Sequence, residues 1–348
     1  MIAVIVVCAL VVAHTANVLL LLAGHARGFD LPSMAAQWAF LVAGIFVELI
    51  THEAGHLTAG AAMGWRCIRF GFGPFEFFRE RQAWKRARVK MLWGAFVRQV
   101  PPSFHAFRRQ KTMTLLSGPL SSLFFALLFA AVALMSAHPL VFNLFGRMGL
   151  VSLLGVLELI PREKDGIGSD GYRLWQVIRG GKPIDDMMRE IMAEASNFNA
   201  PRYRDWPHAA VLRLAATGDW YSIYLAYLHT LDASDLEAAS GYMRRLIALL
   251  PEEQPNPHCA CEAAYWLATY GGDTEAARLW LRRAGQNVEP EVRLRAEAAV
   301  ALADGHTDHA QALANRALAL MRTPPACGSD ACEIDLLNQI VRGVAACA

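Results

Sequence analysis

The sequence has few charged residues for its length. Only 18% of its 348 residues are charged, whereas ordinary soluble domains have about 25%. The shortage is concentrated in the first 160 positions, where apolar side chains dominate, and charge becomes common afterwards. This distribution predicts a membrane-embedded half followed by a soluble half. The formal net charge of +2 says little about partners, but from the distribution of charge along the chain we expect no nucleic acid to bind.

The sequence also lacks cysteine pairs with the spacing of a structural zinc site. It has seven cysteines, and two close pairs lie in the second half, Cys259 with Cys261 and Cys327 with Cys332. Neither pair is a C-x-x-C motif. We expect reduced thiols if this half is cytoplasmic, whereas an external location would favour disulfides.

No basic segment precedes the first apolar run, residues 2–22. The alternative interpretation, a cleaved signal peptide, requires a basic start and an apolar stretch of only about 7–15 residues. We therefore expect this run to be the first of about four transmembrane helices.

A His-Glu-x-x-His motif is the main chemical feature of the chain. It comprises His52, Glu53 and His56, and it continues the apolar stretch 34–47. On a helix the two histidines lie one turn apart on one face, so both can bind a single Zn²⁺. Glu53 is placed to take a proton from a metal-bound water. A chance match on a soluble core helix is the alternative, but ionisable residues inside an apolar span tend to be functional.

The segment after this helix is expected to form a β-hairpin at the membrane surface. Residues 68–75 and 88–97 are apolar and glycine-containing, which predicts short strands on either side of a polar turn. Arginine and lysine are frequent over residues 79–111. Between two membrane spans, such a stretch indicates a cytoplasmic loop rather than a nucleic-acid patch. The chain would then start inside, cross outward, and return through the motif helix.

Two more spans are predicted at residues 112–137 and 140–160, although Arg147 interrupts the second. Gly118 and Pro119 lie near the start of the first of these. They could kink the helix and open space beside it, or serve packing alone.

A catalytic zinc site needs a third protein ligand, and a carboxylate is suitable. Asp165 and Asp170 both lie in the loop after the last predicted span. The residues alone leave both open, although Asp170 opens the next helix and would be held more rigidly.

The remainder of the chain is predicted to be soluble and all-helical, with a proline-rich joint at residues 251–257. Gly271 and Gly305 are 34 residues apart, as are Ala276 and Ala310, and this is the tetratricopeptide period. A plain helical bundle is the alternative. We expect three regions: a membrane core over 1–172, a helical region over 173–250 and a tetratricopeptide-like region over 251–348.

The membrane half resembles the site-2 protease family of intramembrane zinc metalloproteases. Four stretches carry the resemblance: His52-Glu53-Ala54-Gly55-His56, Phe70-Gly71-Phe72-Gly73-Pro74, Ser117-Gly118-Pro119-Leu120 and Ser169-Asp170-Gly171. Two positions depart from the family pattern, because Ser121-Ser122 and Glu158 stand where the family often has asparagine.

The resemblance implies about one Zn²⁺ per chain, bound by His52, His56 and Asp170, with Glu53 as the general base. It also implies substrate contacts at Phe72, Gly118, Pro119 and Ser122. The expected activity is hydrolysis of peptide bonds within or next to transmembrane segments of a membrane protein or peptide. The alternative is a catalytically silent membrane adaptor that binds a protein partner through its helical repeats.

The expected location is a bacterial inner membrane, in contact with the lipid bilayer, with the C-terminal region cytoplasmic. That region would recruit a protein partner or gate substrates.

Overall fold

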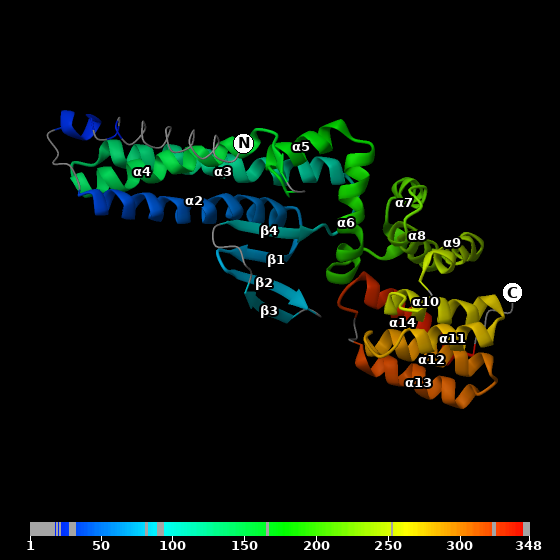
Figure 1. Ribbon diagram of the computed structural model, residues 1–348. Helices are drawn as coiled ribbons and strands as arrows, with labels where there is room; N and C mark the ends of the chain where they lie inside the picture. The colour runs from blue at the N-terminus through cyan, green and yellow to red at the C-terminus, as the bar shows by residue number, and fades with distance from the viewer. Residues whose placement is uncertain are drawn as a thin grey trace. The chain divides into compact units, whose positions relative to one another are not determined.

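The computed structural model describes residues 18, 20, 22–27, 33–80, 83–88, 94–164, 167–251, 253–321 and 325–343 (Figure 1). The chain is mostly helical and separates into two compact units. The first unit comprises Met1–Gln99 with Ala106–Gly180, and the second comprises Val100–His105 with Gly181–Ala348.

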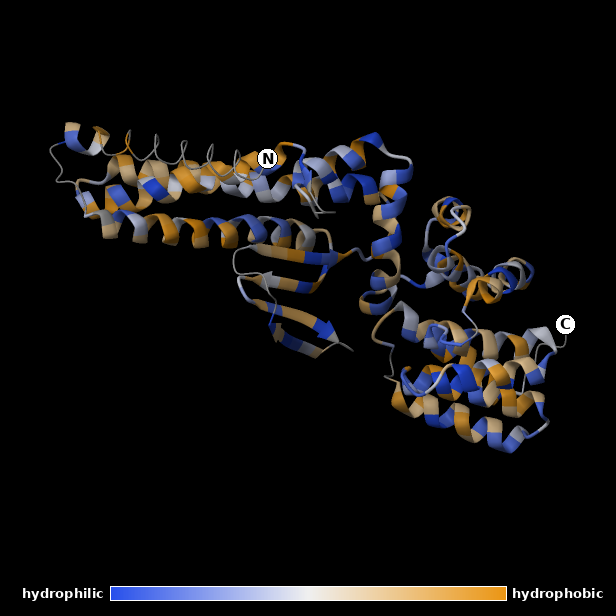
Figure 2. Ribbon diagram, in the orientation of Figure 1, coloured by the Kyte–Doolittle hydropathy of each residue, from blue (hydrophilic) through white to orange (hydrophobic). Residues whose placement is uncertain are grey.

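Among the described residues of the first unit, three helices are long and apolar enough to cross a membrane. They are α2 (Met34–Ala62), α3 (Phe107–Met135) and α4 (Pro139–Gly155), the last extended by the 3₁₀ turn η1 (Val156–Leu159). Hydrophobic residues follow all three along their length (Figure 2). Three of the predicted spans thus coincide with long apolar helices, as candidate membrane spans. The predicted span at 2–22 lies largely outside the described residues, so the expected number of four is not established.

Small residues bring the three helices close together. A side chain at Gly55 of α2 would collide with the Ser117 carbonyl of α3, and one at Gly44 would lie 3.3 Å from Val151 of α4. Close backbone approach of this kind is how helices associate where no hydrophobic effect drives them together. The crossing of α2 and α3 at Gly55 lies within the His-Glu-x-x-His motif, and it brings α3 against that motif.

The segment after α2 forms a four-stranded sheet. The prediction of a single two-stranded hairpin is therefore wrong, because the sheet has two more strands. The strands β1 (Arg66–Phe72), β2 (Phe75–Glu80), β3 (Ala83–Arg88) and β4 (Ala95–Val100) are ordered β3-β2-β1-β4. β1 pairs antiparallel with β2, and β2 with β3.

The expected polar turn contains the β2–β3 hairpin, in which arginines of one strand lie over aromatic rings of the other. Arg79 lies 5.0 Å from the ring centre of Trp84, and Arg86 lies 5.6 Å from that of Phe75. These cation–π pairs let basic residues occupy strand positions that hydropathy alone assigns to a loop.

Helix α5 (Asp170–Arg179) follows a two-stranded turn of β5 (Glu163–Lys164) and β6 (Ile167–Gly168). Ser169 caps the helix by accepting a hydrogen bond from the Tyr172 amide, and its hydroxyl donates to the Ile160 carbonyl at 2.8 Å. A side chain at Gly171 would collide with the Leu159 carbonyl. The start of α5 is therefore fixed against the end of the last span, and Asp170 opens the helix as predicted.

The second unit is a helical array. Its helices are α6 (Lys182–Phe198), η2 (Tyr203–Asp205), α7 (His208–Ala215), α8 (Trp220–Asp232), α9 (Leu236–Leu249), α10 (Pro257–Trp266), the π-helix η3 (Leu267–Gly271), α11 (Thr274–Arg283), α12 (Pro290–Ala303), α13 (Thr307–Leu320) and α14 (Gly328–Val341). The pairs α8–α9, α10–α11 and α12–α13 pack together. Helix pairs are what the 34-residue period predicts, but they do not establish a tetratricopeptide repeat, which stays a prediction.

Four cysteines lie in the described part of this unit, Cys259, Cys261, Cys327 and Cys332, and all four are buried and unpaired. Burial raises the pKa of the Cys259 and Cys261 thiols to about 12. Thiols of this kind are protonated at neutral pH and behave as small apolar side chains.

A buried ion network crosses the core of the second unit. Arg295, only 1% exposed, donates to Glu262 at 2.6 Å and to Glu333 at 2.7 Å, and it stacks over the Tyr265 ring at 4.2 Å. Tyr227 donates a further hydrogen bond to Glu262 at 3.2 Å. The network links α8, α10, α12 and α14, and it contains two carboxylates for a single guanidinium.

Because this network has one carboxylate more than it has guanidinium groups, we expect the stability of the second unit to depend on pH. Burial raises the pKa of Glu333 to about 7, despite the nearby Arg295. Between about pH 4.5 and 7 the folded state therefore binds more protons at Glu333 than the unfolded state does, so this contribution to stability falls as the pH rises. Relative to Glu333→Gln, which stays neutral, the wild type should lose up to about 3 kcal/mol across this window. Hydrogen exchange of α14 amides, compared between the two proteins at each pH, measures the difference. A difference independent of pH would contradict the prediction.

Candidate metal centre

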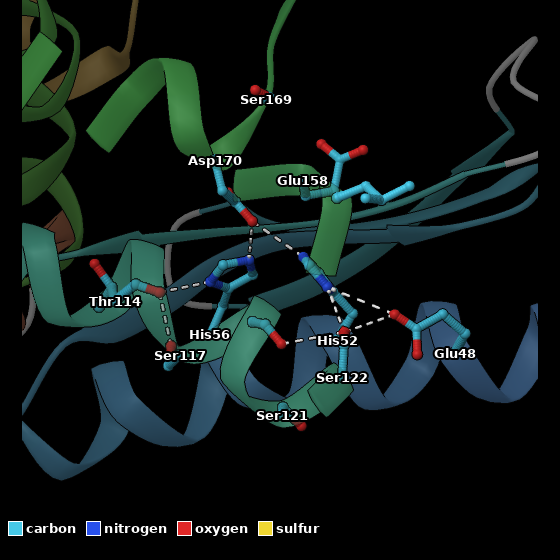
Figure 3. A network of polar contacts seen from close by, with 12 residues as sticks. Glu48, His52, His56, Thr114, Ser117, Ser121, Ser122, Glu158, Ser169 and Asp170 are labelled. Atoms are coloured by element: carbon cyan, nitrogen blue, oxygen red, sulfur yellow. Dashed lines mark hydrogen bonds and ion pairs between the residues drawn. The ribbon is translucent and has the colours of Figure 1, made fainter. Parts of the chain in front are cut away.

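The motif histidines and Asp170 meet at one point (Figure 3). His52 and His56 lie one turn apart on α2, and the Nε2 atom of each is 3.0 Å from Oδ2 of Asp170 at the start of α5. Their possible ligand atoms all lie within 4.8 Å of one another. Within the described ranges, no other group of three or more histidine, cysteine, aspartate or glutamate residues converges in this way.

The hydrogen bonds on the far side of each imidazole assign its tautomer. His56 Nδ1 is 2.6 Å from the Thr114 carbonyl, which can only accept, so this nitrogen carries the proton. His52 Nδ1 is 2.9 Å from Oγ of Ser122, and the Ser122 hydroxyl donates to Glu48 at 2.6 Å. Ser122 must then accept from His52, so Nδ1 is protonated here as well. Both histidines present a bare Nε2 lone pair to Asp170.

Two imidazole lone pairs and a carboxylate facing one another fit a cation. None of the three can donate a hydrogen bond to the others, so they repel unless a positive ion lies between them. A cation bound between the three groups would favour the ionised form of Asp170, which metal binding requires. Two histidines and one carboxylate are the protein ligands of many catalytic zinc sites, which keep a further position open.

Gly118 leaves the space that a metal ion needs. A Cβ atom built on Gly118 would collide with Nε2 of His56 and lie 2.8 Å from Nε2 of His52. Any other residue at this position of α3 would fill the region where the lone pairs converge. This supports the metal interpretation independently of the donor set.

Glu53 lies beside the histidines on the same helix. Its carboxylate interacts electrostatically with His52, His56 and Asp170, and it accepts a hydrogen bond from the backbone amide of Val97 on β4. In the sheet order β3-β2-β1-β4, β4 is an edge strand. The side chain of Gln99 donates to the Leu57 carbonyl at 3.1 Å and so attaches β4 to α2.

The remaining predicted site residues lie in different surroundings, and they do not all face the point where the histidines meet Asp170. Pro119 is buried in α3, and Phe72 at the end of β1 packs on Phe46 of α2 with ring centres 5.6 Å apart. Ser122 is fully buried behind His52. Its expected contact with substrate stays a prediction, but its described partners are polar groups of the protein itself. Asp165 lies outside the described residues.

Sequence reasoning missed Glu48. It lies one turn before His52, and only 7% of it is exposed. The spacing of four residues from a motif histidine, inside an apolar span, is a signal that could have identified it.

Comparison with protein families decides the classification. The model of peptidase family M50 matches residues 40–321, which is most of the chain. The chain belongs to this family. This confirms the resemblance to site-2 proteases and identifies an M50 peptidase, a membrane-embedded metalloprotease by family. The match extends through α13, beyond the half in which the motifs lie. Comparisons with curated proteins and with solved structures returned no match.

Proposed function

We propose that this M50 peptidase is a zinc endopeptidase that hydrolyses peptide bonds within or next to transmembrane segments of a membrane protein or peptide. The observation that carries the proposal is the convergence of the His52 and His56 lone pairs with the Asp170 carboxylate on a helix able to span a membrane. A hydrolytic site at that depth acts on substrates that lie in the bilayer.

In this mechanism His52, His56 and Asp170 hold the metal and Glu53 moves the proton. Bound zinc would polarise the scissile carbonyl and lower the pKa of a water molecule. Glu53 accepts the proton of the attacking water and returns it to the leaving amine. The Val97 amide orients the Glu53 carboxylate for both transfers.

The edge strand β4 supplies a path for the substrate. A helix hides its backbone amides, so a transmembrane substrate must first unwind near the scissile bond. An extended segment can then pair with an exposed strand edge, which satisfies its freed amides. Because β4 contacts Glu53 through Val97, a peptide paired with it would run past the base. Phe72 and Gly118 fit this path as substrate neighbours.

The second unit fits a recruiting role. Stacked helix pairs commonly present a binding surface, so we propose that this unit binds a protein partner or the substrate. The basic residues over 79–111 favour a cytoplasmic location for it, in a bacterial inner membrane.

The first test is zinc content of the full-length protein purified in detergent. We expect about one zinc per chain in the wild type and in Glu53→Gln, and loss in His56→Ala and Asp170→Ala. Asp165→Ala, the aspartate that competes by sequence, is the matched control and should keep zinc. A folded wild type without zinc, or zinc retained in His56→Ala, would overturn the proposal.

Glu53→Gln should then lower cleavage about 10²- to 10⁴-fold, because only proton transfer is lost. The measurement uses quenched-fluorescent transmembrane peptides reconstituted with the enzyme in lipid vesicles. If Glu53→Gln left both cleavage and the cellular role unchanged, the silent-adaptor alternative would gain support.

A further inference from the structure

A buried carboxylate lies one turn before the metal centre, and the proposed mechanism does not use it. Glu48 of α2 accepts a hydrogen bond from Ser122 of α3 at 2.6 Å (Figure 3). Helix α4 approaches it so closely that a side chain at Gly155 would collide with its Oε1. Glu48 is therefore enclosed where all three helices of the bundle meet.

This position is costly for a charged group. A carboxylate inside an apolar span loses its hydration, and hydrogen bonds or an opposite charge must replace it. Oε2 of Glu48 is buried without a well-formed hydrogen bond, although the buried Ser152 of α4 interacts with the carboxylate. His52 Nδ1 lies 3.8 Å from Oε1. The carboxylate is thus surrounded by Ser152 on one helix and by Ser122 and His52 toward the metal centre.

Glu48, Ser122 and His52 form a directed chain of hydrogen bonds. The His52 Nδ1 proton points to Ser122, and the Ser122 proton points to Glu48. This chain fixes the ring orientation of His52 and leaves its Nε2 lone pair directed toward the metal position. It also makes Nε2 a more basic ligand, which donates its electron pair to a metal more strongly. His56 differs, because a backbone carbonyl of Thr114 orients it.

We propose that Glu48 is a positioning residue that acts through Ser122 to hold His52 as a zinc ligand. The inference rests on the proposed zinc site, and it makes Ser122 a part of that site's support.

The test is zinc affinity, measured by chelator competition on the full-length protein. Glu48→Gln keeps a hydrogen-bond acceptor for Ser122 but removes the charge, and Ser122→Ala breaks the chain. Each should weaken zinc binding about 10- to 100-fold, the range found when a ligand's hydrogen-bond partner is lost. Because Glu48 acts on His52 through Ser122, the two changes affect one chain of hydrogen bonds, and the double variant should lose less than the product of the two single effects.

Glu158→Gln is the matched control. It makes the same chemical change near the centre, but Glu158 pairs with Arg162 at 2.9 Å and its side chain is 44% exposed. Its zinc affinity should stay within about twofold of the wild type. Wild-type zinc affinity in Glu48→Gln, or effects of Glu48→Gln and Ser122→Ala that simply multiply, would overturn the inference. An unmutated protein that binds no zinc would instead overturn the proposed function.

A measurement on the wild type covers the case in which the variants do not fold. Nitrogen-15 NMR of histidine-labelled protein loaded with Cd²⁺ should show His52 bound through Nε2 and protonated at Nδ1. Binding of the metal through Nδ1 of His52 would contradict the inference.

Discussion

Replacing Gly118 by alanine is expected to abolish zinc binding while leaving the helical bundle folded. In most helices this change is favourable by up to about 1 kcal/mol, because alanine is the better helix former. Here the new methyl group would occupy the space between the Nε2 atoms of His52 and His56. Hydrogen bonds to Ser122 and Thr114 hold the two rings from behind, so they cannot swing away without breaking those bonds.

We expect at least about a hundredfold loss of zinc affinity, measured by chelator competition, and a matching loss of cleavage. Gly44→Ala is the control, because it places a methyl group 3.3 Å from Val151 at another helix crossing, away from the histidines. Its zinc affinity should be unchanged. A Gly118→Ala protein with one tightly bound zinc would show that the metal lies elsewhere.

Replacing Arg295 by methionine is expected to destabilise the second unit by about 3–5 kcal/mol at neutral pH. Methionine fills much of the volume, but Glu262 and Glu333 would lose the guanidinium that both of them contact. Two carboxylates buried together without a cation must take up protons or draw water into the core. The loss should therefore shrink toward pH 5, where protonation of Glu333 removes one of the unpaired charges.

Hydrogen exchange of amides in α10, α12 and α14 reports this destabilisation within the whole protein. Arg278→Met is the control, because Arg278 pairs with Glu275 and Asp304 at the surface, and its loss should cost at most about 1 kcal/mol. The triple change of Arg295→Met, Glu262→Gln and Glu333→Gln should recover much of the stability, since it removes the unpaired charges together. Equal effects of Arg295→Met at pH 5 and pH 7 would contradict this account.

Local sequence patterns were sufficient for one part of the site. The four-residue spacing of His52 and His56 places them on one helix face whatever the rest of the chain does, and the apolar context identifies the spans. The choice of Asp170 over Asp165 needed the family resemblance, because both aspartates lie in the same loop. The fit of Asp170 with the histidines then depends on how Gly171 packs against Leu159.

The roles of Ser122 behind His52 and of Arg295 in the second unit could not be predicted, because they arise from helix crossings. Ser122 is 70 positions from His52, and only the contact of α3 with α2 brings them together. Likewise, the sequence shows Arg295 only as a charged residue in a predicted helix. Its two carboxylate partners, Glu262 and Glu333, come into contact with it through the packing of α10 and α14. The sheet was underestimated for a different reason, since hydropathy averages over Arg79 and Arg86 and conceals their pairing with Trp84 and Phe75.

The late position of Asp170 has a consequence for biosynthesis. Chains emerge from the ribosome N-terminal end first, and His52 precedes Asp170 by 118 residues. A nascent chain that has inserted its spans but not yet folded α5 would hold only two of the three proposed ligands. The proposed zinc site would therefore be completed only when α5 folds, after the helix that carries His52 and His56 has been made.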